Sequence, residues 1–210
     1  MFHKIINFFT HKDKQMRENR WLFIIILIAS LAALLAAFVL SVEAIELIKD
    51  PNASLSCDIN SVISCGTVGK TSYASMFGFP NSFIGMTSEP LFIVFAIAAL
   101  MGVKFPKKFM LGLQLAAVFA FIFAAYLFII GTYFIHALCP WCLSVDVATI
   151  AMLFAITRYN IKEGNLYLTR NLDKKARKFV EKDFDVFAVV LIFVVAIAVM
   201  IMEFGSSLFV

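Results

Sequence analysis

The sequence predicts an all-α integral membrane protein with five membrane-spanning helices. Of its 210 residues, 62% are hydrophobic and only 15% are charged, whereas soluble domains are nearer half apolar and a quarter charged. Five runs of about 20 apolar residues follow one another, each long enough to cross the hydrocarbon core of a bilayer as a helix. The chain therefore has room for a helical bundle but not for a large soluble domain.

The first span follows a basic leader and could be mistaken for a signal peptide. Its apolar stretch is longer than the roughly 7–15 residues of a signal-peptide core, and no clear small-residue cleavage site follows, so we interpret it as a retained anchor. The predicted spans are Trp21 to Leu40, about Phe83 to Val103 (interrupted by Glu89-Pro90), about Phe109 to Phe134, about Pro140 to Thr157 and about Asp185 to Met202.

Lysine and arginine predict the orientation of these spans. Sixteen of the 18 basic residues fall before the first span, after the second or after the fourth, and only Lys49 and Lys70 fall on the other side. Because basic loops stay in the cytoplasm, the N-terminus is expected inside and the C-terminus outside. The net charge of +4 is then explained by topology and contact with anionic membrane lipid rather than by nucleic-acid binding.

The same pattern divides the chain into four segments. A cytoplasmic N-terminal segment, 1–20, precedes a four-helix bundle, 21–157, which includes an external loop, 41–82. A basic cytoplasmic connector, 158–184, leads to a fifth span with a short external tail, 185–210. In this topology all four cysteines face the oxidising side of the membrane, where disulfides persist.

Two of the cysteines form a CPWC motif at the head of the fourth span, Cys139 to Cys142. Proline favours the first helical position, so Cys139 is expected at the N-cap and Cys142 one turn inside. The helix N-terminus would then lower the pKa of Cys139. A structural disulfide gains little from so short a loop, which favours a redox-active dithiol. Zinc is a weaker alternative, because only His136 joins these cysteines.

The other pair, Cys57 and Cys65, lies in the loop between the first two spans. This loop is rich in serine, glycine and asparagine but also contains many apolar residues, so we expect a cap with a short helix over the mouth of the bundle. Its cysteines could form a shuttle disulfide that exchanges with an outside thiol protein and then with Cys139. The alternative is a disulfide that only staples the loop.

Two acids lie within predicted spans, where a carboxyl is costly and suggests function. Asp146 follows Cys142 by four residues on the same helix face, and Cys142 itself is the deeper thiol, placed to meet a lipid-soluble oxidant. Glu89 shares a face with Asn81. Quinone reduction consumes protons that either acid could supply. The alternative is that both are protonated structural groups hydrogen-bonded to a neighbouring helix, and Glu89 fits this alternative better than Asp146 does. The role of His136 near Cys139 also stays open.

Together these motifs resemble the bacterial homologues of vitamin K epoxide reductase. The resemblance rests on Cys57-Asp58, the Cys-x7-Cys spacing to Cys65, the FGFPNSFIG run before the second span and CPWC at the head of the fourth, and it covers roughly residues 15–160. It implies a four-helix bundle around a quinone, covered by the cysteine-bearing loop, with an added fifth helix. The thioredoxin-like domain that many bacterial members carry would here be a separate protein.

The resemblance also implies a role for each site residue. Cys57 would exchange with the partner, Cys65 would pass electrons to Cys139, and Cys142 would react with the quinone. Asn81 matches the family asparagine that hydrogen-bonds a quinone oxygen. Vertebrate members have a tyrosine four residues after the second CxxC cysteine. Here Asp146 stands at that position of the quinone site, which favours ordinary quinone reduction over epoxide reduction.

The predicted function is a thiol:quinone oxidoreductase of the cytoplasmic (inner) membrane with its active site on the periplasmic side. It would reoxidise an extracytoplasmic thioredoxin-like (DsbA-like) protein and reduce menaquinone or ubiquinone, and so support disulfide formation in secreted proteins. A DsbB-type enzyme is disfavoured because its CxxC pair comes first along the chain. The remaining alternatives are a non-catalytic scaffold stapled by two disulfides and a transporter that uses Glu89 and Asp146.

Overall fold

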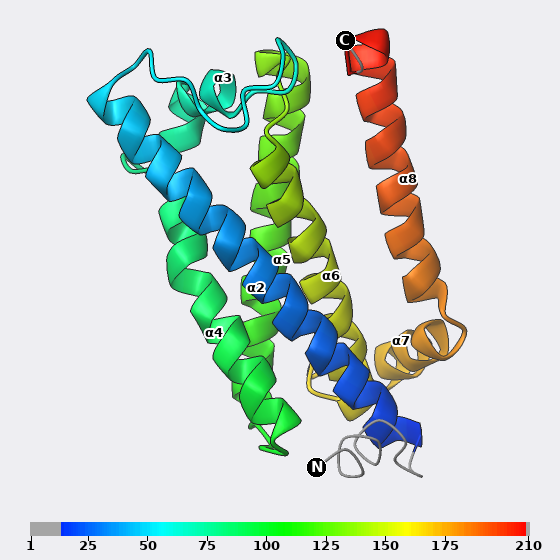
Figure 1. The fold of residues 1–210 in the computed structure, drawn as a ribbon. Helices are drawn as coiled ribbons and strands as arrows, with labels where there is room; N and C mark the ends of the chain where they lie inside the picture. The colour runs from blue at the N-terminus through cyan, green and yellow to red at the C-terminus, as the bar shows by residue number, and fades with distance from the viewer. Residues whose placement is uncertain (1–13, 209–210) are drawn as a thin grey trace, which may run out of the picture.

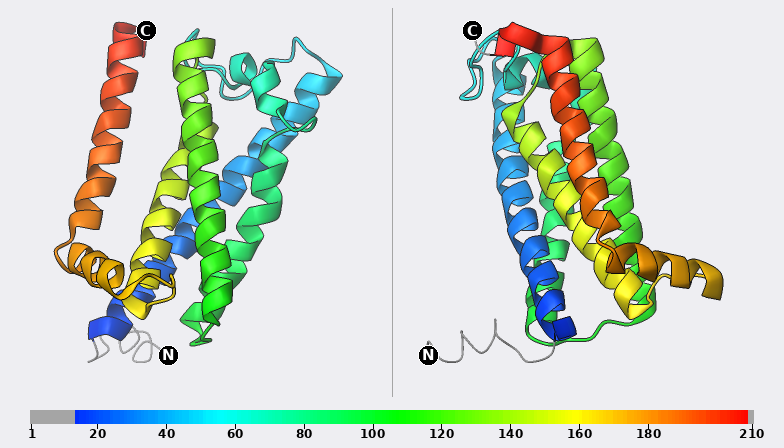
Figure 2. Two further views of the ribbon diagram at one scale, coloured as in Figure 1. Left: turned by 180° about the vertical axis from the view of Figure 1, so that it is seen from behind. Right: turned by 90° about the vertical axis from the view of Figure 1, so that its right-hand side faces the viewer.

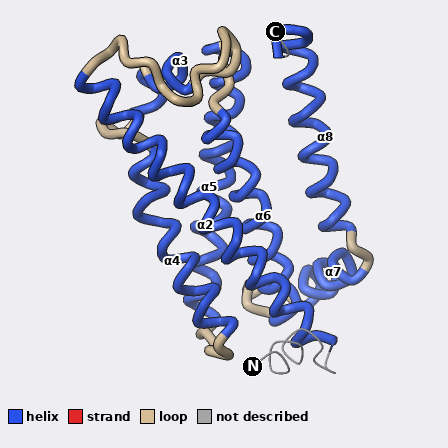
Figure 3. Tube along the Cα trace, viewed as in Figure 1, coloured by secondary structure: helices blue, strands red, loops and turns tan. Residues whose placement is uncertain are grey.

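The computed structural model describes residues 14–208, which form helices joined by loops and no β-strand (Figures 1 and 3). Five of the helices are long and apolar enough to cross a membrane, so the predicted all-α membrane fold is confirmed. The long helices are α2 (Lys14–Lys49), α4 (Ser82–Leu100), α5 (Lys107–Ile130), α6 (Pro140–Glu163) and α8 (Phe184–Phe204), and the shorter ones are α3 (Cys65–Gly69), η1 (Ser72–Ser75), the π-helix η2 (Gly131–Ile135), α7 (Arg170–Glu181) and η3 (Gly205–Leu208).

Four helices, α2, α4, α5 and α6, make the bundle, in which α2 packs along both α4 and α6, and α5 packs along α6. Small residues let these helices approach closely, as is usual in membranes. A Cβ atom on Gly85 of α4 would lie only 2.9 Å from the Cβ of Ala37 on α2. The core of the bundle also contains larger fully buried side chains, among them Ile26, Phe95 and Met152.

The fifth long helix, α8, stands apart from the bundle over most of its length (Figures 1 and 2). None of the residues in its most apolar window is buried, as expected for a helix surrounded by lipid. It is attached at both ends: Arg158 of α6 binds Asp185 near its start at 2.8 Å, and Phe204 at its other end is buried against Val62 and Leu138.

Two helices extend further than the spans that hydropathy predicts. Residues 41–49 belong to the predicted external loop but continue α2, and α6 runs on to Glu163 before Gly164 ends it with a φ of 66°. Hydropathy detects only the apolar part of a helix, whereas hydrogen bonding continues into the polar flanks. The predicted connector contains α7. Residues 1–13 of the predicted N-terminal segment and residues 209–210 of the tail lie outside the described residues.

Both cysteine-bearing segments lie at the same end of the bundle. The loop between α2 and α4 and the start of α6 share this end with the end of α8, while α7 and the start of α2 lie at the opposite end (Figures 1 and 2). The fold therefore brings together two motifs that are more than 70 residues apart in the sequence.

Candidate sulfur relay and cavity

The loop between α2 and α4, which we call the cap, is organised by the carboxylate of Asp58. This carboxylate accepts hydrogen bonds from the backbone N–H of Leu55 at 3.0 Å, the hydroxyl of Ser64 at 2.7 Å and the backbone N–H of Gly66 at 2.8 Å. Burial raises the pKa of Asp58, but these hydrogen bonds and nearby Lys70 outweigh it and leave the pKa below its ordinary value. A Cβ on Gly66 would lie 2.8 Å from Asp58 Oδ2, so glycine suits this position.

The cap is joined to the CPWC segment by backbone hydrogen bonds. The N–H of Leu138 donates to the carbonyl of Val62 at 2.7 Å, and the N–H of Ser64 donates to the carbonyl of Leu138 at 3.0 Å. Ile63 and Leu138 thus form a short parallel bridge. Leu138 directly precedes Cys139, and Ile63 lies two residues before Cys65, so the bridge sets Cys65 beside Cys139.

Three cysteine sulfurs lie next to one another at this contact, and together with Cys142 they form what we call the sulfur relay. Cys57 and Cys65 form a disulfide, and the Sγ of Cys65 lies 3.0 Å from the Sγ of Cys139. Cys139 and Cys142 are thiols in this structure. Exchange begins when a thiolate contacts a disulfide sulfur, so Cys139 is placed to exchange with the disulfide of the cap.

The start of α6 places both of its cysteines as the sequence predicts. Cys139 is the N-cap, with extended backbone angles, and Pro140 occupies the first helical position. The Sγ of Cys139 accepts a hydrogen bond from the backbone N–H of Cys142 at 3.4 Å. The Cys142 thiol, together with the backbone N–H groups of Cys142 and Trp141, outweighs burial and lowers the pKa of Cys139. The predicted N-cap is therefore confirmed, and the pKa of Cys139 shifts in the predicted direction.

A cavity of about 810 Å³ lies between the cap and the four helices of the bundle. Its size falls within the usual range for small-molecule sites, about 300–1,000 Å³. Cys139 and Cys142 line it, as do Asn81 and Asp146. Most of the remaining wall is apolar, and aromatic rings from two helices contribute to it: Phe92, Phe119 and Phe123.

The family follows from a comparison with known protein families. Residues 24–157 match the vitamin K epoxide reductase family, and this region contains all four cysteines, the cap and most of the four-helix bundle. The chain belongs to the vitamin K epoxide reductase family. A comparison with curated proteins gave no match. Membership confirms the predicted family and indicates a membrane oxidoreductase with cysteine chemistry, in a family that uses quinones.

The cavity suits the flat apolar ring of the quinones that this family uses. Apolar and aromatic walls would hold such a ring, and Cys142 lies at the wall, beside the space that the ring would occupy. The amide of Asn81 donates to the carbonyl of Tyr73 at 2.7 Å and accepts from the N–H of Met76 at 3.2 Å. Asn81 therefore anchors the cap, and the second N–H of its amide could serve a quinone oxygen.

Two acids line the same cavity. Asp146 is partly buried on α6, one helical turn beyond Cys142, as predicted. Glu89 on α4 is only 5% exposed, and its Oε2 makes no hydrogen bond within the described residues. A buried carboxyl oxygen without a hydrogen bond is costly, so this oxygen would gain from a polar group in the cavity.

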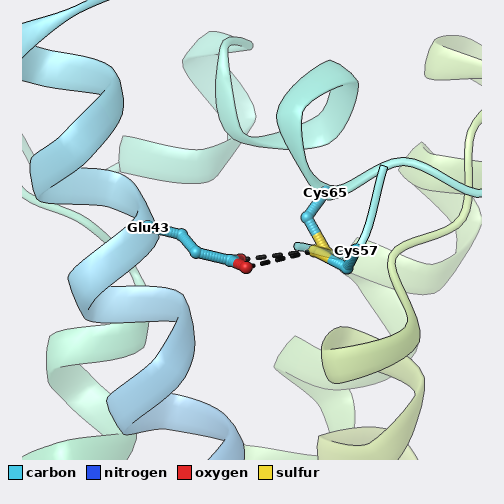
Figure 4. Close-up of side chains that lie close together, drawn as sticks. All are labelled: Glu43, Cys57 and Cys65. Atoms are coloured by element: carbon cyan, nitrogen blue, oxygen red, sulfur yellow. Dashed lines mark hydrogen bonds between the residues drawn. A yellow bond between two sulfur atoms is a disulfide. The ribbon is translucent and has the colours of Figure 1, made fainter. Parts of the chain in front are cut away.

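Two further acids lie near this end of the bundle, and neither is predicted from the sequence. Glu203 of α8 lies 3.3 Å from Nδ1 of His136, so this histidine pairs with the fifth helix rather than with a cysteine. Glu43 of α2 lies against the cap disulfide (Figure 4), with its two carboxylate oxygens 3.3 and 3.4 Å from the Sγ of Cys57. Glu43 is not predicted as a site residue because residues 41–49 are predicted as loop. If these residues are instead taken as helix, Glu43 falls one turn before the apolar Leu47, and the sequence then places an acid on the buried face of that helix.

Glu43, Cys57 and Cys65 are close enough to share a metal ion. Metal binding by cysteine requires thiolates, however. In the structure the two sulfurs are joined in a disulfide, so they are not a ligand set in this redox state. The arrangement instead places an acid beside a disulfide sulfur.

Proposed function

We propose that this protein is a membrane thiol:quinone oxidoreductase that reoxidises a thioredoxin-like protein and passes the electrons to menaquinone or ubiquinone. The observation that carries the proposal is the 3.0 Å contact between the sulfurs of Cys65 and Cys139. This contact connects the disulfide of the cap with the dithiol that lines the cavity. Disulfide formation in secreted proteins would be the biological result.

The cycle begins when a thiolate of the partner attacks Cys57 and Cys65 leaves as a thiolate. The second thiol of the partner then releases Cys57, and the partner departs with a disulfide. Cys65 attacks Cys139 in the Cys139–Cys142 disulfide, and Cys142 leaves with the electron pair. Cys57 attacks Cys65, which re-forms the cap disulfide and frees Cys139. This is the redox state of the structure, with Cys57 and Cys65 bonded and the other two reduced.

The dithiol at the cavity completes the cycle. Cys139 and Cys142 give up two electrons and two protons, which convert a quinone to a hydroquinone, and return to a disulfide. Asn81 is placed to hydrogen-bond a quinone oxygen, and Asp146 and Glu89 are placed at the cavity wall to pass protons. The four cysteines, Asn81 and Asp146 are therefore the site residues we assign.

Access to Cys57 requires movement of the cap. Cys57 is only 6% exposed, so a partner thiol reaches it after part of the loop opens. Exposed apolar side chains on the cap, such as Ile59 and Phe77, offer a surface that a partner could contact while the loop opens.

The basic residues support an orientation with the cap outside the cell. The end of the bundle that carries α7 is the basic end, and the cap lies at the other end (Figure 1). By the positive-inside rule the N-terminus is then cytoplasmic and the cysteines face the periplasm. In this arrangement 21–157 is the catalytic bundle, 158–184 is a cytoplasmic connector and 185–210 carries the fifth helix in the cytoplasmic membrane.

The test is a reconstitution of the whole reaction. The full chain is purified into lipid nanodiscs with a reduced thioredoxin-like protein and either a menaquinone or a ubiquinone. We expect one quinone reduced for each partner dithiol oxidised, and serine at any one of the four cysteines should lower turnover more than about 10³-fold. Wild-type rates in all four serine variants would contradict an enzyme that uses these cysteines. Loss only on substitution of Glu89 or Asp146 would indicate a transporter instead.

A further inference from the structure

Glu43 makes the closest carboxylate contact to a sulfur of the relay in the described residues. It projects from α2 toward the cap disulfide (Figure 4), and its oxygens lie 3.3 and 3.4 Å from the Sγ of Cys57. It is only 6% exposed and accepts a hydrogen bond from the hydroxyl of Ser56 at 3.1 Å. We propose that Glu43 is the catalytic acid and base of Cys57, an inference that rests on the proposed function.

The contact between Glu43 and Cys57 requires a proton whether the Cys57–Cys65 pair is oxidised or reduced. A disulfide sulfur carries no hydrogen, so a buried carboxylate beside it would be charged and incompletely paired, which is costly. With Glu43 protonated, its O–H can donate to the sulfur of Cys57. When the disulfide is reduced, the S–H of Cys57 can donate to the carboxylate. One proton held between Glu43 and Cys57 therefore satisfies the pair in both states.

This proton has a defined path in the step in which Cys57 attacks the Cys65–Cys139 disulfide. Cys57 is a thiol while Cys65 is bonded to Cys139. Glu43 takes the proton from Cys57 as its sulfur attacks Cys65, the bond between Cys65 and Cys139 breaks, and Cys139 leaves with the electron pair. Glu43 is then a carboxylic acid beside the re-formed disulfide, and Figure 4 shows Glu43 beside the disulfide in this redox state.

The same proton returns when the partner acts. Exchange with the partner releases Cys57 as a thiolate, and Glu43 protonates it, so Glu43 ends each cycle unchanged. The surroundings suit this role, because Leu47, Leu55 and the other cysteines enclose Cys57 in an apolar cluster. Bulk water is thus a poor substitute for a nearby carboxyl.

The discriminating variant is Glu43→Gln, which keeps the size of the side chain and can still bind Ser56 but cannot accept the thiol proton. We expect turnover with reduced partner and quinone to fall about 10²-fold or more. We also expect the Cys65–Cys139 disulfide to accumulate in samples quenched with acid during turnover, measured by mass-spectrometric mapping. The matched control is Glu46→Gln, which removes an exposed acid from the same helix and should behave as wild type.

A pH profile gives a second readout that a structural defect would not produce. Without Glu43, solvent base must deprotonate Cys57, so the rate of the variant should rise with pH more steeply than that of wild type. The titratable neighbours of Glu43 are Asp58 on the cap, Glu46 on α2, and Cys139 and Cys142 of the CPWC motif. All four remain in both proteins, so the difference between the profiles reports Glu43.

The outcomes separate this inference from the function on which it rests. If Glu43→Gln turns over like Glu46→Gln, the inference is wrong and the relay stands. Slow turnover with no trapped Cys65–Cys139 disulfide and no steeper pH profile would mean that Glu43 only supports the cap, which also overturns it. If wild type itself fails to reduce quinone, the proposed function fails first.

Discussion

Cys139→Ser is expected to stop repeated turnover while leaving one round of partner oxidation. The disulfide between Cys57 and Cys65 does not involve Cys139, so a reduced partner can still reduce it once. No sulfur then lies at 3.0 Å from Cys65 to take the electrons onward. Rapid mixing with thiol quantification should show a burst of one partner oxidised per protein and a steady rate more than about 10³-fold below wild type.

The control for this variant is Ser144→Ala. Ser144 is exposed in the first turns of the same helix, and its hydroxyl binds only the backbone carbonyl of Pro140 among its described contacts. The Ser144→Ala variant should show the same burst of partner oxidation and the same steady rate as wild type. Repeated turnover by Cys139→Ser would show that electrons reach the quinone without Cys139, and the proposed order of the sulfurs would be wrong.

Ala120→Trp is expected to impair quinone reduction without affecting exchange between the partner and the cap. Ala120 of α5 lines the cavity, and an indole there would occupy space that the quinone ring needs. Forcing added volume into a packed site typically costs about 1–3 kcal/mol, and a loss of that size in quinone binding corresponds to a rise of roughly 5- to 150-fold in the KM for quinone. Steady-state assays over a range of quinone concentrations measure the KM, and rapid mixing measures the burst of partner oxidation by the cap disulfide.

Ile122→Trp is the matched substitution outside the cavity. Ile122 lies on the same helix and is 60% exposed on the outer surface of the bundle, where a bilayer tolerates an indole. It should keep the wild-type KM. An Ala120→Trp protein with an unchanged KM would place the quinone elsewhere, whereas loss of the burst as well would indicate a general defect in packing.

The parts of the fold that local sequence determines were predictable. Runs of apolar residues predict five spans, because a helix must satisfy its own backbone hydrogen bonds in lipid. The cysteine at the N-cap of α6 follows from Pro140, since proline suits the first helical position. The family followed from four short motifs, and the match over residues 24–157 confirms it.

The remaining parts depend on contacts between distant segments. The bridge from Ile63 to Leu138 joins two loops, and no property of either loop alone predicts that pairing. Glu43 lies just past the apolar window of its span, so hydropathy assigns it to the cap. Its contact with Cys57 exists only because α2 continues as a helix to Lys49. The roles of Asn81 and Asp146 stay predictions, since both line the cavity but neither shows a contact that requires a quinone.

The most direct test of the relay is a disulfide that forms between Cys65 and Cys139. In the double variant Cys57→Ser and Cys142→Ser, these two thiols remain and should stay in contact. Treatment of membranes with a small amount of diamide, followed by mass-spectrometric mapping, should give rapid and nearly complete Cys65–Cys139 cross-linking. The complementary double variant, which retains Cys57 and Cys142, should cross-link far more slowly. Equal rates in the two variants, or no cross-link between Cys65 and Cys139, would contradict the relay.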